Sequence, residues 1–249
     1  MMFDLSGTVA LVTGANSGIG QAVALALAAA GADIATVGRS AADATGARVR
    51  ALGRRWLDVH ADLSTTASVP GAVATALATF GTIDILVNNA GIIRRADAID
   101  MTEADWDAVQ NTNLKTLFFL TQAVARPMLA RGSGKIINIA SMLSFQGGVR
   151  VPGYTAAKSG VAGLTRALAN EWAAQGVNVN AIAPGYIATA NTAALQADPT
   201  RSRQIVERIP AGRWGQPADI GGAAVFLASS AADYINGHVL AVDGGWLAR

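Results

Sequence analysis

Short runs rich in β-branched residues alternate along this chain with longer stretches rich in alanine. The runs predict seven buried strands, at residues 9–13, 33–37, 55–59, 83–88, 135–140, 177–183 and 238–243. The alanine-rich stretches carry apolar residues at helical spacing and predict helices at 20–30, 69–80, 104–130 and 156–175. Such alternation is typical of a parallel sheet with helices on both faces. The pattern predicts an α/β fold, a doubly wound Rossmann sheet of about seven strands in a single domain over residues 1–249.

One segment departs from this alternation. Residues 186–217 are polar and irregular. Long connections of this kind on a regular scaffold often cover a functional site. We therefore predict that this segment forms a lid.

Composition narrows the functional classes. Only 14% of the residues are charged and 51% are hydrophobic, whereas about 25% charged is usual, so part of the surface is expected to be buried in an oligomer. The net charge is +2 and no block of Lys or Arg occurs, so nucleic acid is not an expected partner. The chain has no cysteine and two histidines, so no metal site is expected.

The N-terminal region carries no sign of export or membrane insertion. The first basic residue is Arg39, so the positively charged start of a signal peptide is missing. The longest apolar run near the start, 22–32, has 11 residues, while spanning a bilayer takes about 20. We predict a cytoplasmic protein without a membrane partner.

A glycine-rich turn follows the first predicted strand. The sequence TGANSGIG places Gly14, Gly18 and Gly20 between that strand and the start of a helix. Glycines permit a tight turn and a close approach of the backbone, and the helix N-terminus offers N–H groups to a pyrophosphate. The turn therefore predicts a dinucleotide site.

Polar side chains follow the next strands toward the same crevice. The sequence NNAG, at 88–91, comes after the fourth strand, where the strand order should reverse. Its asparagines can bond backbone groups and so shape the crevice. Ser141 ends the next strand, and Tyr154 opens the following helix. We expect Ser141 and Tyr154 to converge on the crevice.

Tyr154 and Lys158 lie four residues apart, on one face of the predicted helix. An ammonium group beside a phenol stabilises the phenolate. We therefore expect Lys158 to lower the pKa of Tyr154 and to make it a proton donor and acceptor near neutral pH. A half-buried tyrosine beside a solvated lysine is the alternative.

Taken together, these motifs resemble the short-chain dehydrogenase/reductase family over essentially the whole chain. The glycine turn, NNAG, the serine, Y-x-x-x-K and the PG of APGYIAT occur in the family's order and spacing. The resemblance implies a nicotinamide-dependent oxidoreductase with a catalytic tetrad. Its members would be Asn113, Ser141, Tyr154 and Lys158.

The resemblance also implies a role for each member of the tetrad. Tyr154 would be the general acid or base, and Ser141 would hold the substrate oxygen. Lys158 would bond the nicotinamide ribose and lower the pKa of Tyr154. Asn113 would position a water that links Lys158 to solvent.

Further cofactor contacts follow from the same resemblance. Asp62 would contact the adenine, and Ile187 and Thr189 would hold the nicotinamide carboxamide. The other expected cofactor-binding residues are Gly14, Asn16, Ser17, Gly18, Ile19, Gly20, Arg39, Leu63, Asn89, Ala90, Gly91, Tyr154, Lys158, Pro184 and Gly185.

The choice between NAD and NADP rests on the end of the second strand. An acidic residue there selects NAD, because it bonds the ribose 2′-hydroxyl. This chain has Gly38 followed by Arg39 and Ser40, and an arginine could accept the 2′-phosphate of NADP. The sugar-acid enzymes of the family, which the second half of this chain resembles, are mainly NAD-linked, and this favours NAD. Both cofactors remain open.

The second half of the chain is most similar to the branch of the family that acts on deoxy sugar acids. A sugar acid carries a carboxylate, and the planar guanidinium of arginine suits it well. Arg94, Arg95 and Arg150 lie on loops at the carboxyl ends of strands, and Gln146 could bond sugar hydroxyls. We expect at least one of these arginines to contact the carboxylate, although most loop arginines are simply solvated.

Two other functions use the same motifs. A 3-oxoacyl carrier-protein reductase, or another carbonyl reductase of the family, would apply the tetrad to a different substrate. A nucleotide-sensing protein without turnover would keep the fold, but its tyrosine or lysine would be expected to differ.

The low charge and the family resemblance both favour a homotetramer. The helix that carries Tyr154 places Val161, Leu164, Leu168 and Trp172 along one stripe, and the preceding helix carries the sequence LFFL at 117–120. We expect these two helices to form the subunit contact, although core packing could also use them.

Overall fold

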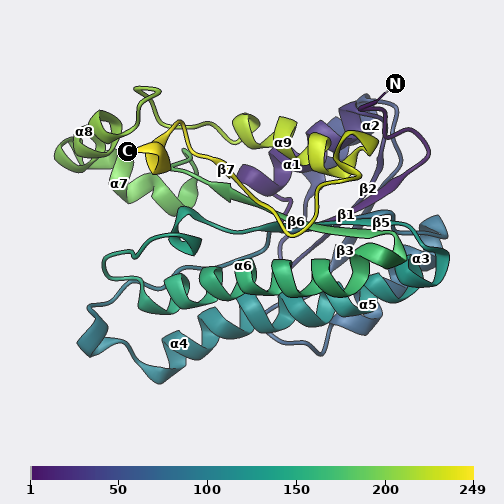
Figure 1. Ribbon diagram of the computed structural model, residues 1–249, viewed down its shortest axis with the longest axis horizontal. Coiled ribbons are helices and arrows are strands. Elements are labelled where there is room, and N and C mark those ends of the chain that lie inside the picture. Colours follow the sequence, from purple (N-terminus) through teal and green to yellow (C-terminus); the bar gives the residue numbers. More distant parts are fainter. Residues whose placement is uncertain (1) are drawn as a thin grey trace.

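The computed structural model describes residues 2–249, which form a parallel sheet of seven strands (Figure 1). The strands run in the order β3-β2-β1-β4-β5-β6-β7. Their bounds are Val9–Thr13 (β1), Asp33–Gly38 (β2), Trp56–His60 (β3), Ile85–Asn88 (β4), Gly134–Ile139 (β5), Val177–Pro184 (β6) and Val239–Val242 (β7). The predicted doubly wound fold is confirmed, and every predicted strand end lies within two residues of the observed one.

Helices cover both faces of the sheet. They are α1 (Gly18–Ala29), α2 (Asp43–Ala51), α3 (Val69–Phe80), α4 (Glu103–Gln110), α5 (Thr116–Arg131), α6 (Pro152–Trp172), α7 (Ala193–Ala197), α8 (Pro199–Arg208) and α9 (Ala218–Ala228). In Figure 1, α1 and α9 lie above the sheet and α5 and α6 below it. Apolar side chains of α1 and α9 form one buried cluster, and those of α3, α5 and α6 form another. Because both faces are covered, the strands are almost uniformly apolar.

Three local features differ from the sequence prediction. The expected helix at 104–130 is interrupted by a π-helical turn, Asn111–Lys115, between α4 and α5. Helix α2 was not predicted, because its sequence, DATGARVRA, contains Val49 as its single large apolar residue. It packs through Gly46, where a Cβ atom would overlap the ring of Trp56. The segment 186–217 is not irregular, because it contains α7 and α8.

The segment 186–217 leaves the core and returns to it at one place. Ala188 N donates to the Gly215 carbonyl at 2.8 Å, and Gly215 N donates to the Tyr186 carbonyl at 2.9 Å. Between these two points, Asp198 caps the N-terminus of α8, and its carboxylate accepts hydrogen bonds from Thr200 N and Arg201 N. Figure 1 places α7 and α8 beside the C-terminus, at one end of the molecule.

The apolar stripe of α6 packs inside the chain rather than on its surface. Val161, Leu168 and Trp172 are buried against the chain's own core. These three residues of the predicted stripe therefore serve the chain's own core, whereas Leu164 is half-buried. A subunit contact through α5 and α6 stays a prediction. The exposed apolar side chains on this side of the molecule are Trp106 on α4 and Phe119 on α5. Within residues 2–249, no helix has the length and apolar character needed to cross a bilayer.

Candidate active site

The strand order reverses between β1 and β4, and the motifs that follow these strands are bonded together there. The hydroxyl of Thr13 accepts hydrogen bonds from the N–H groups of Asn89 and Ala90, both at 2.9 Å. The Asn89 amide donates to the carbonyls of Thr13 (2.9 Å) and Gly14 (3.1 Å). Thr13 was not predicted as a site residue, although it opens the TGANSGIG sequence. Asn89 thus shapes the turn through its side chain.

Asn88 crosslinks the middle of the sheet rather than the crevice backbone. Its amide donates to the Thr121 hydroxyl at 2.8 Å and to Asn138 Oδ1 at 2.9 Å. Asn138 in turn donates to the Thr165 hydroxyl at 3.0 Å. This buried chain of polar groups connects β4 and β5 to α5, which follows the turn that contains Asn113, and to α6, whose first half carries Tyr154 and Lys158.

The glycine turn fits a pyrophosphate. Gly14 and Gly18 have φ angles of 64° and 56°, which favour glycine. A Cβ atom on Gly20 would overlap the Gly14 carbonyl and the Asn89 amide. Helix α1 begins at Gly18 with neither a side-chain cap nor an acidic residue in its first turn, so its N–H groups are available to an anion. The exposed Asn16 and Ser17 lie before this helix start.

The segment 186–217 begins directly opposite this turn. Thr189 Cγ2 lies 3.5 Å from the position that a Cβ atom on Gly18 would take. Thr192 Oγ1 donates to the Ile187 carbonyl at 2.7 Å and accepts from Thr189 N at 3.1 Å. Gly185 approaches β7 so closely that a Cβ atom would lie 2.6 Å from Asp243 Cα. The segment from Pro184 to Thr189 is therefore held against the crevice.

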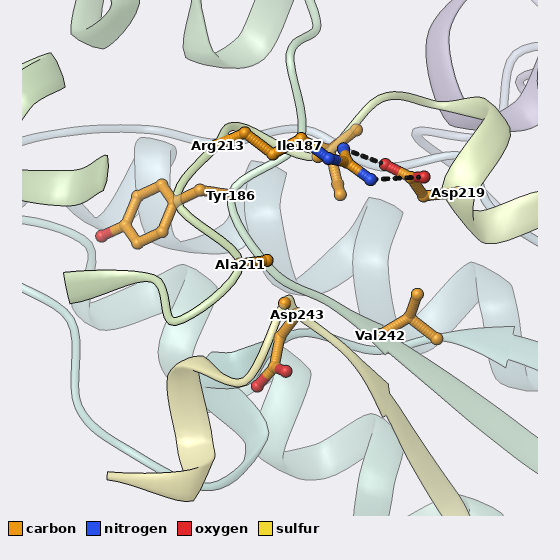
Figure 2. Close-up of a pocket in the computed structure, with 9 residues that line it drawn as sticks. Tyr186, Ile187, Ala211, Arg213, Asp219, Val242 and Asp243 are labelled. Carbon is orange, nitrogen blue, oxygen red and sulfur yellow. Dashed lines mark hydrogen bonds and ion pairs between the residues drawn. The ribbon is translucent and has the colours of Figure 1, made fainter. Parts of the chain in front are cut away.

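A cavity of about 260 Å³ lies between the two ends of the segment 186–217 and the end of β7 (Figure 2). Tyr186, Ile187 and Asp243 line it, and the ion pair between Arg213 and Asp219, at 2.7 Å, crosses one side. No member of the expected tetrad lines this cavity. Ile187 lines this cavity, but the acid–base residues do not, so the cavity is separate from the place of the proton transfer.

Arg39 follows the end of β2, and Asp62 follows the end of the neighbouring strand β3. The Asp62 carboxylate accepts a hydrogen bond from Ser64 N at 2.9 Å, and this bond is the main cause that lowers the pKa of Asp62. The charge of Arg39 contributes in the same direction. Leu63 turns its side chain into the core. Arg39 therefore presents an exposed cation where the second strand ends.

Ser141, Tyr154 and Lys158 meet where β5 ends and α6 begins. Ser141 Oγ accepts a hydrogen bond from Leu143 N at 3.1 Å. The side chain of Lys158 is only 3% exposed, and its ammonium donates to the Ile139 carbonyl at 2.6 Å. The same ammonium lies 5.6 Å from the centre of the Tyr154 ring. Tyr154 itself is half-buried.

The pKa values in this group differ from the expectation. Burial raises the pKa of Tyr154 to about 12, and the Ser141 hydroxyl and the Arg95 charge oppose this shift only partly. Burial also lowers the pKa of Lys158 to about 8. The expectation that Lys158 lowers the pKa of Tyr154 is thus wrong for this structure, because loss of hydration dominates both groups. Tyr154 is a neutral proton donor at neutral pH.

Asn113 lies in the π-helical turn and is fully buried. Its Oδ1 accepts a hydrogen bond from Ile92 N, and its Nδ2 donates to the Ile92 carbonyl, both at 2.8 Å. A Cβ atom on Gly91 would lie 3.0 Å from Asn113 Oδ1. The side chain of Asn113 therefore holds the segment after NNAG in place. The role of positioning a water stays a prediction.

The three candidate arginines have different surroundings. Arg94 pairs with Asp105 at 3.2 Å, and Arg150 pairs with Asp97 at 3.0 Å. Arg150 also has a φ angle of 63° and accepts a hydrogen bond from Ala96 N, so it fastens two loops together. Within residues 2–249, Arg95 has no ion-pair partner and bonds only the Asn191 carbonyl, at 3.1 Å. Arg95 is therefore the candidate whose charge is not already neutralised.

The buried lysine makes stability depend on pH. Its pKa falls from 10.5 to about 8 on folding, so the unfolded chain binds the proton more tightly and stability rises with pH between these values. The rise is at most about 3 kcal/mol. We expect Lys158→Met to raise the free energy of unfolding near pH 7 and to lose this rise.

Urea denaturation at about pH 7.5 and about pH 9.5 would measure the effect, because the opposite contribution of Tyr154 begins only above about pH 10. Exposed Lys115→Met is the matched control and should behave like the wild type. Equal pH dependence in the wild type and Lys158→Met would contradict the expectation.

Comparison with known proteins agrees with this site. A family model described as enoyl-(acyl carrier protein) reductase matches residues 14–247. The 2-dehydro-3-deoxy-D-gluconate 5-dehydrogenase of Escherichia coli (strain K12) is 59% identical over 99% of this chain and 98% of that protein. A solved structure from Agrobacterium tumefaciens with bound NADP is 58% identical, with a TM-score of 0.94 over 100% of this chain and 99% of that one.

A third relative carries both a nucleotide and a small acid. The gluconate 5-dehydrogenase of Burkholderia cenocepacia J2315, solved in complex with NADP and tartrate, is 42% identical, with a TM-score of 0.95 over 100% of this chain and 98% of that one. The fold and the site define a nicotinamide-dependent oxidoreductase that acts on CH–OH groups. The chain belongs to the short-chain dehydrogenase/reductase family. The resemblance read from the motifs is confirmed, whereas the preference for NAD gains no support.

Proposed function

We propose that this protein interconverts the keto and hydroxy forms of a deoxy sugar acid with NADP(H). One observation carries the proposal: Tyr154, a neutral proton donor, lies close enough to Arg95 for the arginine charge to act on its pKa. Within residues 2–249, Arg95 itself has no ion-pair partner. A donor serves the oxygen of a carbonyl, and a cation serves a carboxylate. The 59% identity to a deoxy sugar acid dehydrogenase supports the same substrate class.

Each member of the tetrad has a proposed role in this reaction. A bound nicotinamide supplies the hydride in reduction and receives it in oxidation. Tyr154 donates a proton to the substrate oxygen during reduction, and Ser141 holds that oxygen by a hydrogen bond. Lys158, with its lowered pKa of about 8, bonds the nicotinamide ribose and returns a proton to Tyr154. Asn113 fixes the segment around Ile92 that borders the nicotinamide.

Cofactor choice is proposed to depend on Arg39. Its exposed guanidinium at the end of β2 suits the 2′-phosphate of NADP. We expect Arg39→Ala to lower kcat/KM for NADPH by about 10–100-fold, as for the loss of a charged hydrogen bond. The value for NADH should change little. Arg48→Ala, an exposed arginine on α2, is the control, and equal losses with both cofactors would contradict the proposal.

The lid and the assembly are also proposals. Helices α7 and α8, in the segment 186–217, would cover the substrate. A homotetramer would bury the exposed Phe119 (41%) and Trp106 (40%), and a chain of low charge has few means of keeping such side chains in water. Light scattering at micromolar concentration should give the mass of four chains. A monomer would contradict the assembly.

The alternative function is that of an acyl carrier-protein reductase. The matching family model is described by such an activity. Purified protein with NADPH or NADH should be assayed against a panel of keto sugar acids and of 3-oxoacyl thioesters. The proposal expects NADPH oxidation with at least one keto sugar acid, at a kcat/KM well above that of any thioester. The reverse order would favour the rival.

A further inference from the structure

Trp246, the fourth residue from the C-terminal end, contacts three segments that are distant in sequence. Its ring lies 4.8 Å from that of Tyr186. Tyr186 directly precedes Ile187, one of the two residues expected to hold the nicotinamide. The guanidinium of Arg208, at the end of α8, lies 4.0 Å from the ring centre. Its indole N–H donates to Gln146 Oε1 at 3.3 Å, on the loop that follows Ser141. Trp246 is only 5% exposed.

The bond to Gln146 fixes the orientation of an amide. An indole N–H can only donate, so Gln146 must offer its oxygen to Trp246. The amide NH₂ group is then directed elsewhere, and it has no other partner within the described chain. A freely rotating amide can serve as either donor or acceptor. With its oxygen turned toward Trp246, Gln146 presents its NH₂ group, a donor, on the opposite side.

We propose that Trp246 is a positioning residue and that it sets Gln146 to recognise an acceptor oxygen of the substrate, either keto or carboxylate. The inference rests on the proposed function and adds a residue from the chain's end to substrate selection. The inference also assigns Gln146 the role of a hydrogen-bond donor, whereas the sequence predicts only that it bonds sugar hydroxyls. The gain is selectivity, because a fixed donor favours a group that can only accept.

A double-mutant cycle tests the inference. Trp246→Phe keeps most of the packing against Tyr186 but removes the N–H group. We expect it to raise KM for the keto acid by about 3–10-fold, with kcat within about twofold and KM for NADPH unchanged. Gln146→Ala should raise the same KM at least as much, and adding Trp246→Phe to it should have no further effect.

A purely structural role would give different results. The effect of Trp246→Phe would then be the same in both backgrounds and would follow a fall in Tm, with KM for NADPH also changed. Trp214→Phe is the matched control, because Trp214 also packs on Tyr186 but donates to Ser202 on α8. It should leave KM for the keto acid unchanged. Additive effects, or no effect of Trp246→Phe, would overturn the inference.

The failure of the proposed function can be told apart from the failure of this inference. If the wild type reduces no keto sugar acid, the proposed function is wrong, and the substrate part of the inference falls with it. The contact itself is still tested by the ¹⁵N resonance of the Trp246 indole, assigned with Trp246→Phe. That resonance should move in Gln146→Ala, and an unchanged position would overturn the assignment of Gln146 as its acceptor.

Discussion

Replacing Tyr154 with phenylalanine is expected to lower kcat by about 10²–10⁴-fold, the usual contribution of a general acid. The ring is kept, so the surroundings of Lys158 and the binding of NADPH should survive. The loss should be confined to the chemical step because only the donated proton is removed. Steady-state kinetics with a keto sugar acid, together with NADPH fluorescence titration, would measure both quantities.

The control for this variant is Tyr234→Phe, since Tyr234 is fully exposed far along the chain from the site. It should keep the wild-type kcat. If Tyr154→Phe retained more than a tenth of the wild-type rate, Tyr154 would not be the acid. Lost NADPH binding would instead indicate that the ring position had changed.

The second large effect is expected at Arg95. Its alanine variant should raise KM for a keto sugar acid by about 10–100-fold, equivalent to about 1.4–2.8 kcal/mol of lost binding. Activity on a neutral ketone of similar size should scarcely change, because no carboxylate is then to be bound. Steady-state kinetics on the two substrates gives the comparison within one variant.

Arg94→Ala and Arg150→Ala are the matched controls for Arg95. Both arginines already pair with an aspartate, so removing either should change KM by less than about threefold. A wild-type KM in Arg95→Ala, with a raised KM in one of the controls, would assign the carboxylate to that arginine. A wild-type KM in all three variants would remove the carboxylate hypothesis.

The fold was predictable because its signal is strong and local. Buried parallel strands need continuous β-branched runs, and seven such runs occur between helical stretches. Helices α2, α7 and α8 were missed because they bury little. In α8, for example, Ile205 alone is buried. Their stability comes from tertiary contacts, which a local pattern does not contain. The π-helical turn at Asn111–Lys115 has no known spacing signal either.

The candidate site was predictable in position but not in its electrostatics. Motif spacing placed Ser141 and Tyr154 at neighbouring element ends, and the structure brings both to the same place. The predicted direction of the pKa shift of Tyr154 was wrong, because the spacing of Tyr154 and Lys158 contains no information on how deeply each is buried. Ion pairing of Arg94 and Arg150, and the bond between Trp246 and Gln146, join residues distant in sequence. Such contacts depend on the folded loops.

Hydride is expected to pass between a nicotinamide and the carbon that bears the substrate's hydroxyl. NADPH carrying deuterium at the transferring position of its nicotinamide C4 should be incubated with the protein and a keto sugar acid. Mass spectrometry and NMR of the product should then find one deuterium on the new CH–OH carbon, and Tyr154→Phe should form almost no such product. Reduction without the label on that carbon, or no reduction of any keto sugar acid with either cofactor, would contradict the account.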